Sequence, residues 1–390
     1  MENAIFQLTG RGPLDRALRR IHLLTPDHAH FAARVAFTIS INWLPLLFLT
    51  AYEGHLFNFG NAIGFLNDFA IHFRFLVSLP LLIIFEALLN KRLGTAVQLF
   101  IDRDLIAPLH LPDFHYAAQK ASRLLDSIWP EMILFMLAFV LTLMNIHGDL
   151  PSDFPSWRAL TPEPESVPVS IIWLKSISLP LFRFVIFRWI WRFTVWSWLL
   201  WRISKMKLQL IATHPDQCGG IAFVEIAQTT FAAIVFALMI GSAAGIGEHV
   251  IYGGEPIEAY LEAVLILIVA VCVTVRFPLI FFTGILVKTR RQGEIKFGGL
   301  AMNYVRAFDR KWVTSNEVPE EPLLGTADLQ SLADLGNSYN LARQMKKVLL
   351  NLDSIKALVF ATAFPMLPLI LTLVPEKRMA LFMRIIKGLF

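Results

Sequence analysis

The sequence predicts an all-α protein, a polytopic transmembrane helical bundle of about seven spans with a small cytoplasmic helical region. Two observations predict this fold class. Of the 390 residues, 56% are hydrophobic and only 17% are charged, whereas a soluble domain usually carries about 25% charged residues. The apolar residues also gather in long runs, and a helix needs roughly 20 mostly apolar residues to cross the hydrocarbon of a bilayer.

Seven runs meet or approach the length of a membrane span. Only helices and closed barrels satisfy their backbone hydrogen bonds inside lipid, and these runs are too long for barrel strands. The expected spans are Phe31–Ala51, Ala70–Leu89, Ile128–Ile146, Ser170–Trp201, Ile221–Gly245, Ala259–Val287 and Ala357–Val374.

The spans divide the chain into four regions. These are 1–30, a cytoplasmic N-terminal segment without the apolar core of a cleavable signal peptide; 31–287, six spans with a helical cytoplasmic loop at 90–127; 288–356, a cytoplasmic helical segment; and 357–390, a broken seventh span with an amphipathic tail. In the third region, apolar residues from Leu329 to Leu352 recur mostly at three- and four-residue steps. This spacing predicts an amphipathic helix.

The lysine and arginine residues orient the spans, because cytoplasmic loops of membrane proteins carry an excess of both. Basic residues precede the first span, as at Arg19 and Arg20, and gather after spans two, four and six. The loops after spans one, three and five are neutral or acidic. We therefore expect a multi-pass protein of a bacterial inner (plasma) membrane with its N-terminus in the cytoplasm.

The seventh run fits this orientation less well than the other six. Crossing once more leaves the basic residues of the tail outside, and Pro365, Pro368 and Pro375 interrupt the run. Proline removes a helical hydrogen-bond donor and kinks the backbone. We expect a broken seventh helix followed by an amphipathic tail at the outer interface. The alternative is a re-entrant hairpin that returns the tail to the cytoplasm.

Ionisable residues within the spans form the first candidate site, because charge is costly at that depth and is usually functional. They include Glu86, Glu131 and Glu225, about one turn in from the cytoplasmic ends, and Arg188, Arg192 and Arg276, which lie deeper. In one interpretation these six side chains pair and only hold the bundle together, since unpaired buried charge is more costly.

The fourth span carries the densest group of arginines. Arg188, Arg192 and Arg202 share one face of the expected helix, whereas Arg183 points away near the middle of the span. In one interpretation this face lines a water-filled pathway that attracts anions. In the other, the inner half of the span is an interfacial helix whose arginines and tryptophans hold lipid headgroups.

A turn motif, Thr213-His-Pro-Asp-Gln-Cys-Gly-Gly220, follows span four. Proline restricts the backbone and paired glycines allow left-handed conformations. We therefore expect a stiff turn or hinge at His214, Pro215, Asp216, Gly219 and Gly220; a pH-sensitive hinge is the functional alternative, because histidine titrates near neutrality. The three ligand types in this loop lack a second cluster, so we predict no metal site.

Three stretches resemble an uncharacterised family of bacterial polytopic integral membrane proteins. They are His214–Gly220, Asp328–Tyr339 and Phe364–Pro375, and the resemblance covers roughly the second half of the chain. It implies a polytopic membrane protein. The family carries no assigned activity, so the resemblance assigns no catalytic residue to this sequence.

Taken together, these patterns favour an integral membrane channel or transporter that prefers anions. The candidate pathway residues are Arg183, Arg188, Arg192 and Arg276, with Glu86, Glu131 and Glu225 as intramembrane charge partners. The expected partners are the lipid bilayer, a small inorganic or organic anion and further copies of the chain, and no nucleic acid.

Two alternatives remain. The first is a non-transporting scaffold or regulatory subunit that docks a partner through its cytoplasmic helix. The second is a membrane-embedded enzyme, although no nucleotide loop, HExxH or nucleophile-elbow motif is present. We predict no catalytic residue and no cofactor.

Overall fold

The computed structural model describes residues 6, 31–144, 154–158, 167–314 and 326–370. Over these ranges the chain is helical and contains no strand, which confirms the predicted all-α polytopic class. Six helical stretches are long and apolar enough to cross a membrane, and a bent pair makes a seventh. The segments 1–5, 7–30 and 371–390 lie outside the described residues, so the expectations for the N-terminal segment and the tail are not addressed by the fold.

Most of the seven spans are built from more than one helical element. The first four are α2 (Phe31–Asn42) with α3 (Leu44–Tyr52); α4 (Phe69–His72), η2 (Phe73–Ser78) and α5 (Leu79–Asp102); α6 (Leu111–Asp126) bent by 44° against α7 (Ile128–Met144); and α8 (Val169–Trp173), η4 (Leu174–Ser178) and α9 (Leu179–Ser204). The last three are α10 (Ala222–Thr229) with α11 (Phe231–Ile251); α12 (Glu258–Arg276), η5 (Phe277–Phe282) and α13 (Thr283–Phe308); and α15 (Leu352–Ala363), η7 (Phe364–Met366) and α16 (Leu367–Ile370). Short elements η1 (Phe65–Asn67), η3 (Pro108–His110) and η6 (Asp309–Val313) and the helix α14 (Ala327–Gln344) complete the described chain.

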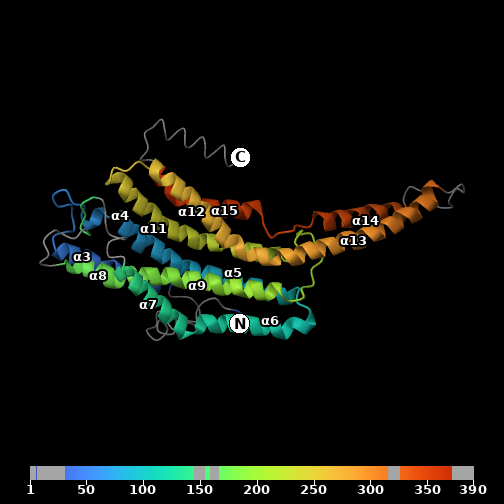
Figure 1. Ribbon diagram of the computed structural model, residues 1–390, viewed down its shortest axis with the longest axis horizontal. Coiled ribbons are helices and arrows are strands. Elements are labelled where there is room, and N and C mark those ends of the chain that lie inside the picture. The colour runs from blue at the N-terminus through green and yellow to red at the C-terminus, as the bar shows by residue number, and fades with distance from the viewer. Residues whose placement is uncertain (1–5, 7–30, 145–153, 159–166, 315–325, 371–390) are drawn as a thin grey trace.

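Spans two, four and six are longer than a bilayer requires. They contain 34, 36 and 56 helical residues, and at 1.5 Å per residue even the shortest measures about 50 Å, against roughly 30 Å of hydrocarbon. The excess length therefore lies beyond the hydrocarbon. Span six continues into α13, and α14 returns beside it (Figure 1).

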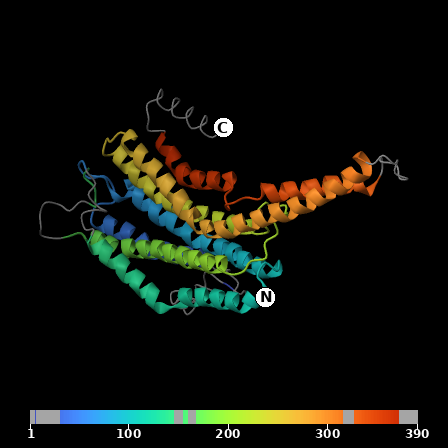
Figure 2. The ribbon, with the colours of Figure 1, turned by 45° about the vertical axis from the view of Figure 1, so that its right-hand side comes forward.

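We call this projecting pair the arm; it comprises residues 283–314 and 326–344. Both views show it extending beyond one end of the bundle, which we call the arm end (Figures 1 and 2). The expected helix from Leu329 to Leu352 stops at Gln344. It stops because the chain then crosses the turn after span four, where the Lys346 N–H donates to the Gln217 carbonyl at 2.7 Å.

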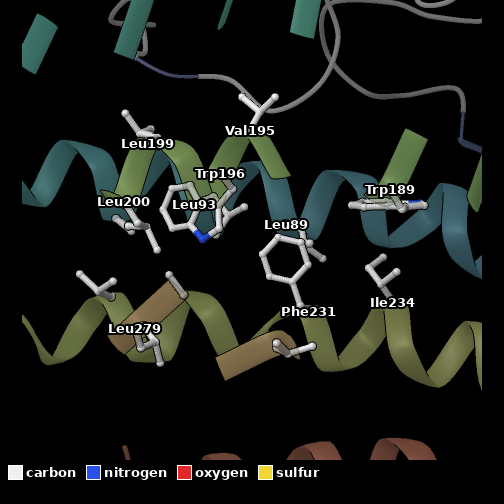
Figure 3. Close-up of a cluster of buried hydrophobic side chains, with 14 of the residues drawn as sticks. Leu89, Leu93, Trp189, Val195, Trp196, Leu199, Leu200, Phe231, Ile234 and Leu279 are labelled. Carbon is white, nitrogen blue, oxygen red and sulfur yellow. The ribbon is translucent and has the colours of Figure 1, made fainter. Parts of the chain in front are cut away.

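The apolar core lies where α9 faces α5, α11 and η5 (Figure 3). Trp196 is fully buried, and Leu93, Phe231 and Leu279 belong to the same cluster. The indole N–H of Trp196 donates to Gln228 Oε1 at 2.7 Å, so its polar atom is satisfied inside the bundle. Large aromatic side chains thus fill the space between the central spans, which fixes the rotation of α9 about its axis.

Spans two and four share a local irregularity that the periodicity of the sequence does not reveal. Each passes through a π-helical turn, η2 or η4, directly before a Ser-Leu-Pro-Leu tetrapeptide at 78–81 or 178–181. Proline has no N–H and its ring clashes with the preceding turn of a regular helix. A wide π turn accommodates such a disruption. Ser178, at the end of η4, donates to the Asn42 carbonyl of α2 at 2.9 Å.

The seventh segment follows α11 along almost its whole length. It begins at the arm end, where the Asn351 N–H donates to Glu225 Oε1 at 2.6 Å. It passes the kink at Pro365 in η7 and ends with Leu369 against Gly247, close to Ile257. The choice between an outer tail and a hairpin that returns the tail concerns residues outside the described chain.

Candidate functional site

A cavity of about 170 Å³ lies between α2, α5 and α9, in the half of the bundle nearer the arm. Its lining combines apolar side chains with four charged ones, namely Arg34, Glu86, Arg188 and Arg192. All four are at least nine-tenths buried. A cavity with buried charges at this depth is the first candidate for function in a membrane protein.

Glu86 joins three spans at the arm-end side of the cavity. Its Oε2 accepts from Arg34 Nη2 of α2 at 2.6 Å, and its Oε1 accepts from Arg192 Nη2 of α9. Arg192 also lies over the Trp189 ring, 4.9 Å from its centroid. The sequence pattern paired Glu86 with the arginines of span four but gave no sign of Arg34, which stands in the first turn of span one.

Arg188 lies one helical turn before Arg192 and contacts α7. Its Nε lies 3.1 Å from Glu131 Oε1 on α7, and its guanidinium carbon lies 5.9 Å from the centroid of the Phe184 ring. Over the described residues of this cluster, three guanidinium groups meet two carboxylates. The described part of this cluster therefore carries one positive charge in excess.

Asn42 lines the same cavity at the level of Ser178, deeper in the bundle than the arginines. The residue is 2% exposed, and its Nδ2 donates to the Thr38 carbonyl at 2.8 Å. Its Oδ1 is buried and receives no hydrogen bond from any part of the chain that the structure describes. Buried carbonyl oxygens are normally paired with a hydrogen-bond donor. The amide oxygen of Asn42, unpaired within the described chain, is therefore an unusual polar feature at the deep end of the cavity.

The other two predicted pathway arginines lie elsewhere. Arg183 is half-buried and donates to Thr142 Oγ1 of α7 at 3.1 Å, and it is not among the residues that line the cavity. Arg276 lies 3.9 Å from Glu225 Oε1 and donates to the Ser354 carbonyl at 2.6 Å. Arg276 and Glu225 thus fasten the seventh segment to spans five and six, apart from the cavity.

A second buried ionic cluster closes the end of the bundle opposite the arm. Arg158 lies between Asp68 and Glu248, with Nε–Oδ2 and Nη2–Oε2 distances of 2.8 and 2.6 Å. Burial lowers the pKa of the Arg158 guanidinium, but the two carboxylates raise it above its ordinary value. Trp157 adds an indole N–H donated to Asp68 at 2.8 Å. The sequence pattern did not predict this cluster, because Arg158 stands in a loop without any periodic signal.

Residues 213–220 form a turn that caps α10. Asp216 accepts hydrogen bonds from the N–H groups of Cys218, Gly220 and Ala222 at 2.8 to 3.1 Å, and His214 Nδ1 lies 2.8 Å from its carboxylate. Gly219 and Gly220 have φ of +69° and +99°, the left-handed region that glycine tolerates. This geometry gives each predicted glycine and the aspartate a local structural role.

The electrostatics of this turn follow from the same contacts. Burial raises the pKa of Asp216, but the N–H groups of Cys218, Gly220 and Ala222 lower it below its ordinary value. Burial and the Asp216 carboxylate raise the pKa of the Cys218 thiol to about 11. A thiol with so high a pKa is a poor nucleophile at neutral pH. The turn therefore offers a structural junction rather than reactive chemistry.

The described residues contain no group of three or more histidine, cysteine, aspartate or glutamate side chains placed to hold a metal ion. The chemistry available at the cavity is instead that of fixed guanidinium donors beside an apolar space. Such donors bind carboxylate, phosphate or halide ions. Comparison with protein-family models, with curated proteins and with solved structures found no match to this chain.

Proposed function

We propose that this protein is a membrane channel or transporter that favours anions and that its pathway passes the cavity between α2, α5 and α9. The observation that carries the proposal is the surplus of positive charge, because the described lining includes three arginines and one glutamate. Coulombic interactions are stronger in a low-dielectric site than in water. Guanidinium groups beside such a space attract anions from the aqueous phase, as rings of arginine do in anion pores.

Arg188 and Arg192 supply the charge of this pathway, and Glu86 and Glu131 hold their side chains in place. Arg183 lies on the face of α9 toward α7, outside the cavity lining. Arg276 acts through its contacts with Glu225 and Ser354, at the junction of spans five, six and seven. The four predicted arginines therefore divide into two at the proposed pathway and two that position the surrounding helices.

The experiment is conductance of the purified protein in planar bilayers under asymmetric chloride. The expected result is a current that reverses toward the chloride equilibrium potential. Arg192→Met should reduce that selectivity, because it removes the surplus charge while Glu86 keeps Arg34 as its partner at 2.6 Å. Arg183→Met is the matched control and should leave selectivity unchanged. A silent bilayer that contains inserted, folded protein contradicts a channel.

A second candidate function is a non-transporting scaffold or regulatory subunit that docks a partner through the arm. Its support is that the arm has little core of its own: among residues 294–314 and 326–341 none is buried. The arginine–glutamate contacts around the cavity fit this candidate too, because they would hold the bundle together without any transport. The absence of current from inserted, folded protein would favour this function.

We further propose that the protein resides in a bacterial inner membrane with its N-terminus and arm in the cytoplasm. Lys288, Arg290 and Arg291 lie at the start of the arm, whereas Glu53 and Glu255 occupy the opposite end of the bundle. Positive loops remain in the cytoplasm during insertion. The resemblance of three sequence stretches to bacterial membrane proteins supports the same location.

We propose, in addition, that copies of the chain associate through their arms. The outer face of α13 exposes Ile295, Met302 and Val305, and η6 continues this face with Val313, at steps of seven, three and eight residues. Ile295 is 66% exposed and Val313 69% exposed. In the bilayer such a face contacts lipid, but beyond the hydrocarbon an apolar stripe is stabilised by a protein partner.

A further inference from the structure

The chemistry of the cavity changes along its length. The guanidinium groups of Arg34, Arg188 and Arg192 occupy one end. Asn42 occupies the other, eight residues after Arg34 in α2, which corresponds to about 12 Å along the helix. A ligand that fills the cavity therefore meets cationic donors at one end and a neutral amide at the other.

The walls between these two ends are apolar. Leu79 and Leu82 of α5 and Leu181 and Val185 of α9 line the cavity. A halide ion at the arginines would leave these walls without a contact, whereas a hydrocarbon body would fill the space. Displacing water from apolar walls favours binding by the area covered.

The volume limits the size of that body. An apolar cavity of roughly 150 Å³ holds a benzene molecule, and this cavity has about 170 Å³. The space suits an apolar body of about six to eight carbon atoms by the same comparison. A long acyl chain exceeds this volume several times over.

Asn42 defines what the far end of the ligand must carry. Its Oδ1 is a buried acceptor without a donor in the described chain, while its Nδ2 is already engaged by the Thr38 carbonyl. The last side-chain torsion of asparagine is soft, so the amide can turn its oxygen toward the cavity, at the cost of the Nδ2 hydrogen bond to the Thr38 carbonyl. A hydroxyl or N–H group on the ligand would satisfy this oxygen, whereas a wholly apolar end would leave it unpaired.

We infer that the cavity binds a small organic acid whose carboxylate contacts Arg188 and Arg192, whose apolar body lies along α5 and α9, and whose distal hydroxyl or N–H group donates to Asn42. This inference rests on the proposed anion site and names the class of ligand that the site takes. The apolar body of this ligand distinguishes it from inorganic anions. Its distal hydroxyl or N–H group distinguishes it from simple carboxylates.

The test compares two acids that differ in one hydroxyl group. The protein, in phosphatidylcholine nanodiscs, is titrated calorimetrically with 4-hydroxyphenylacetate and with phenylacetate, and in parallel with chloride. We expect the hydroxylated acid to bind about tenfold more tightly, the effect of one satisfied hydrogen bond. Asn42→Leu should remove this preference while phenylacetate still binds. Arg192→Met should weaken both acids.

Each other outcome has a distinct meaning. Equal affinity of the wild-type protein for the two acids overturns the role of Asn42, and this comparison needs no variant. Chloride binding without binding of either acid overturns the inference but leaves the proposed anion function intact. Binding of none of the three overturns both. Loss of acid binding in nanodiscs that contain phosphatidylglycerol would assign the site to a lipid headgroup and overturn the inference, whereas unchanged binding supports a free acid.

Discussion

Glu86 shows how a single carboxylate organises a membrane bundle. Two arginines from different spans share its two oxygens, and all three side chains are buried. Removing one partner of a buried ion pair is more costly than replacing both, because an uncompensated charge is left behind. The shared arrangement keeps Glu86 paired when either arginine is lost. Either arginine can therefore be replaced, which changes the charge of the cavity, while Glu86 keeps the other arginine as its ion-pair partner.

Asp216 gives a prediction at the same scale. Asp216→Asn should destabilise the protein by about 2 kcal/mol, because hydrogen bonds to a charged acceptor contribute roughly that much. The lowered pKa of Asp216 sets the sign of the pH dependence. A group with a depressed folded pKa contributes stability that is present above its unfolded pKa, about 3.9, and lost as the pH falls through the folded value.

The measurement is thermal unfolding in detergent, followed by tryptophan fluorescence between pH 3 and pH 7. The wild type and Asp216→Asn should differ above about pH 4 and converge in acid. Asp334→Asn, on the exposed surface of the arm, is the control and should have little effect. A constant difference down to the lowest pH would show that the carboxylate charge contributes nothing to stability.

At the scale of elements, spans two and four obey the same local rule. In both, a proline follows a serine that is fully buried, and the preceding turn widens to a π-helix. The π-helical turn of span four ends at Ser178, which donates to the Asn42 carbonyl. The π-helical turn thus brings Ser178 to the Asn42 carbonyl of α2 at the deep end of the cavity. A regular helix with the same residues would not guarantee this contact.

Gly293 carries the prediction for the elements of the arm. A Cβ at this position would lie 2.4 Å from Ala212 Cβ and 3.3 Å from Ala342 Cβ. Glycine to alanine in a helix interior ordinarily stabilises by about 0.5–1 kcal/mol. Here the clash should reverse that sign, so Gly293→Ala should loosen α13 and α14 from the segment that follows span four.

Gly299 in the same helix is the matched control, because a Cβ added there would have no atom within 4 Å. Gly299→Ala should stabilise the arm or leave it unchanged, whereas Gly293→Ala should speed its cleavage by trypsin and lower the unfolding temperature. Equal behaviour of the two variants would show that Gly293 does not sit at a close contact in solution.

The whole molecule combines a membrane bundle with an arm whose outer part has no buried core among the described residues. Residues 294–314 and 326–341 include no buried side chain, although α13 and α14 touch through Tyr304 and Asp328. Burial of apolar surface is the dominant favourable term in folding. A long two-helix projection is therefore expected to gain stability from contacts with other copies.

The corresponding prediction concerns cross-linking between arms. With Cys218 and Cys272 replaced by serine, Met302→Cys should form a disulfide-linked dimer on mild oxidation, because Met302 lies on the exposed apolar stripe. Ala307→Cys, on a different face of α13 and also exposed, should form much less. Equal cross-linking at the two positions, or none at Met302→Cys in reconstituted protein, would contradict association through this stripe.

The sequence by itself determined the fold class and the approximate positions of the long apolar helices that the structure describes. This was possible because a helix in lipid must satisfy its own backbone and bury a continuous apolar run, and both properties are local. The candidate charges could be recognised for the same reason, since depth follows from position along a span. The stiff turn at Asp216 could also be predicted from the sequence, because proline restricts the backbone and glycine allows left-handed conformations.

Only the tertiary structure decided which charges meet. Partner choice depends on how each helix is rotated and on where it crosses its neighbours, which are properties of packed side chains rather than of periodicity. Arg34 became a partner of Glu86 because α2 lies against α5, and Arg158 joined Asp68 and Glu248 because a loop folds over the end of the bundle. The cavity and the Asn42 oxygen, which no described residue pairs with, arise from the same packing, and no local pattern in the sequence encodes them.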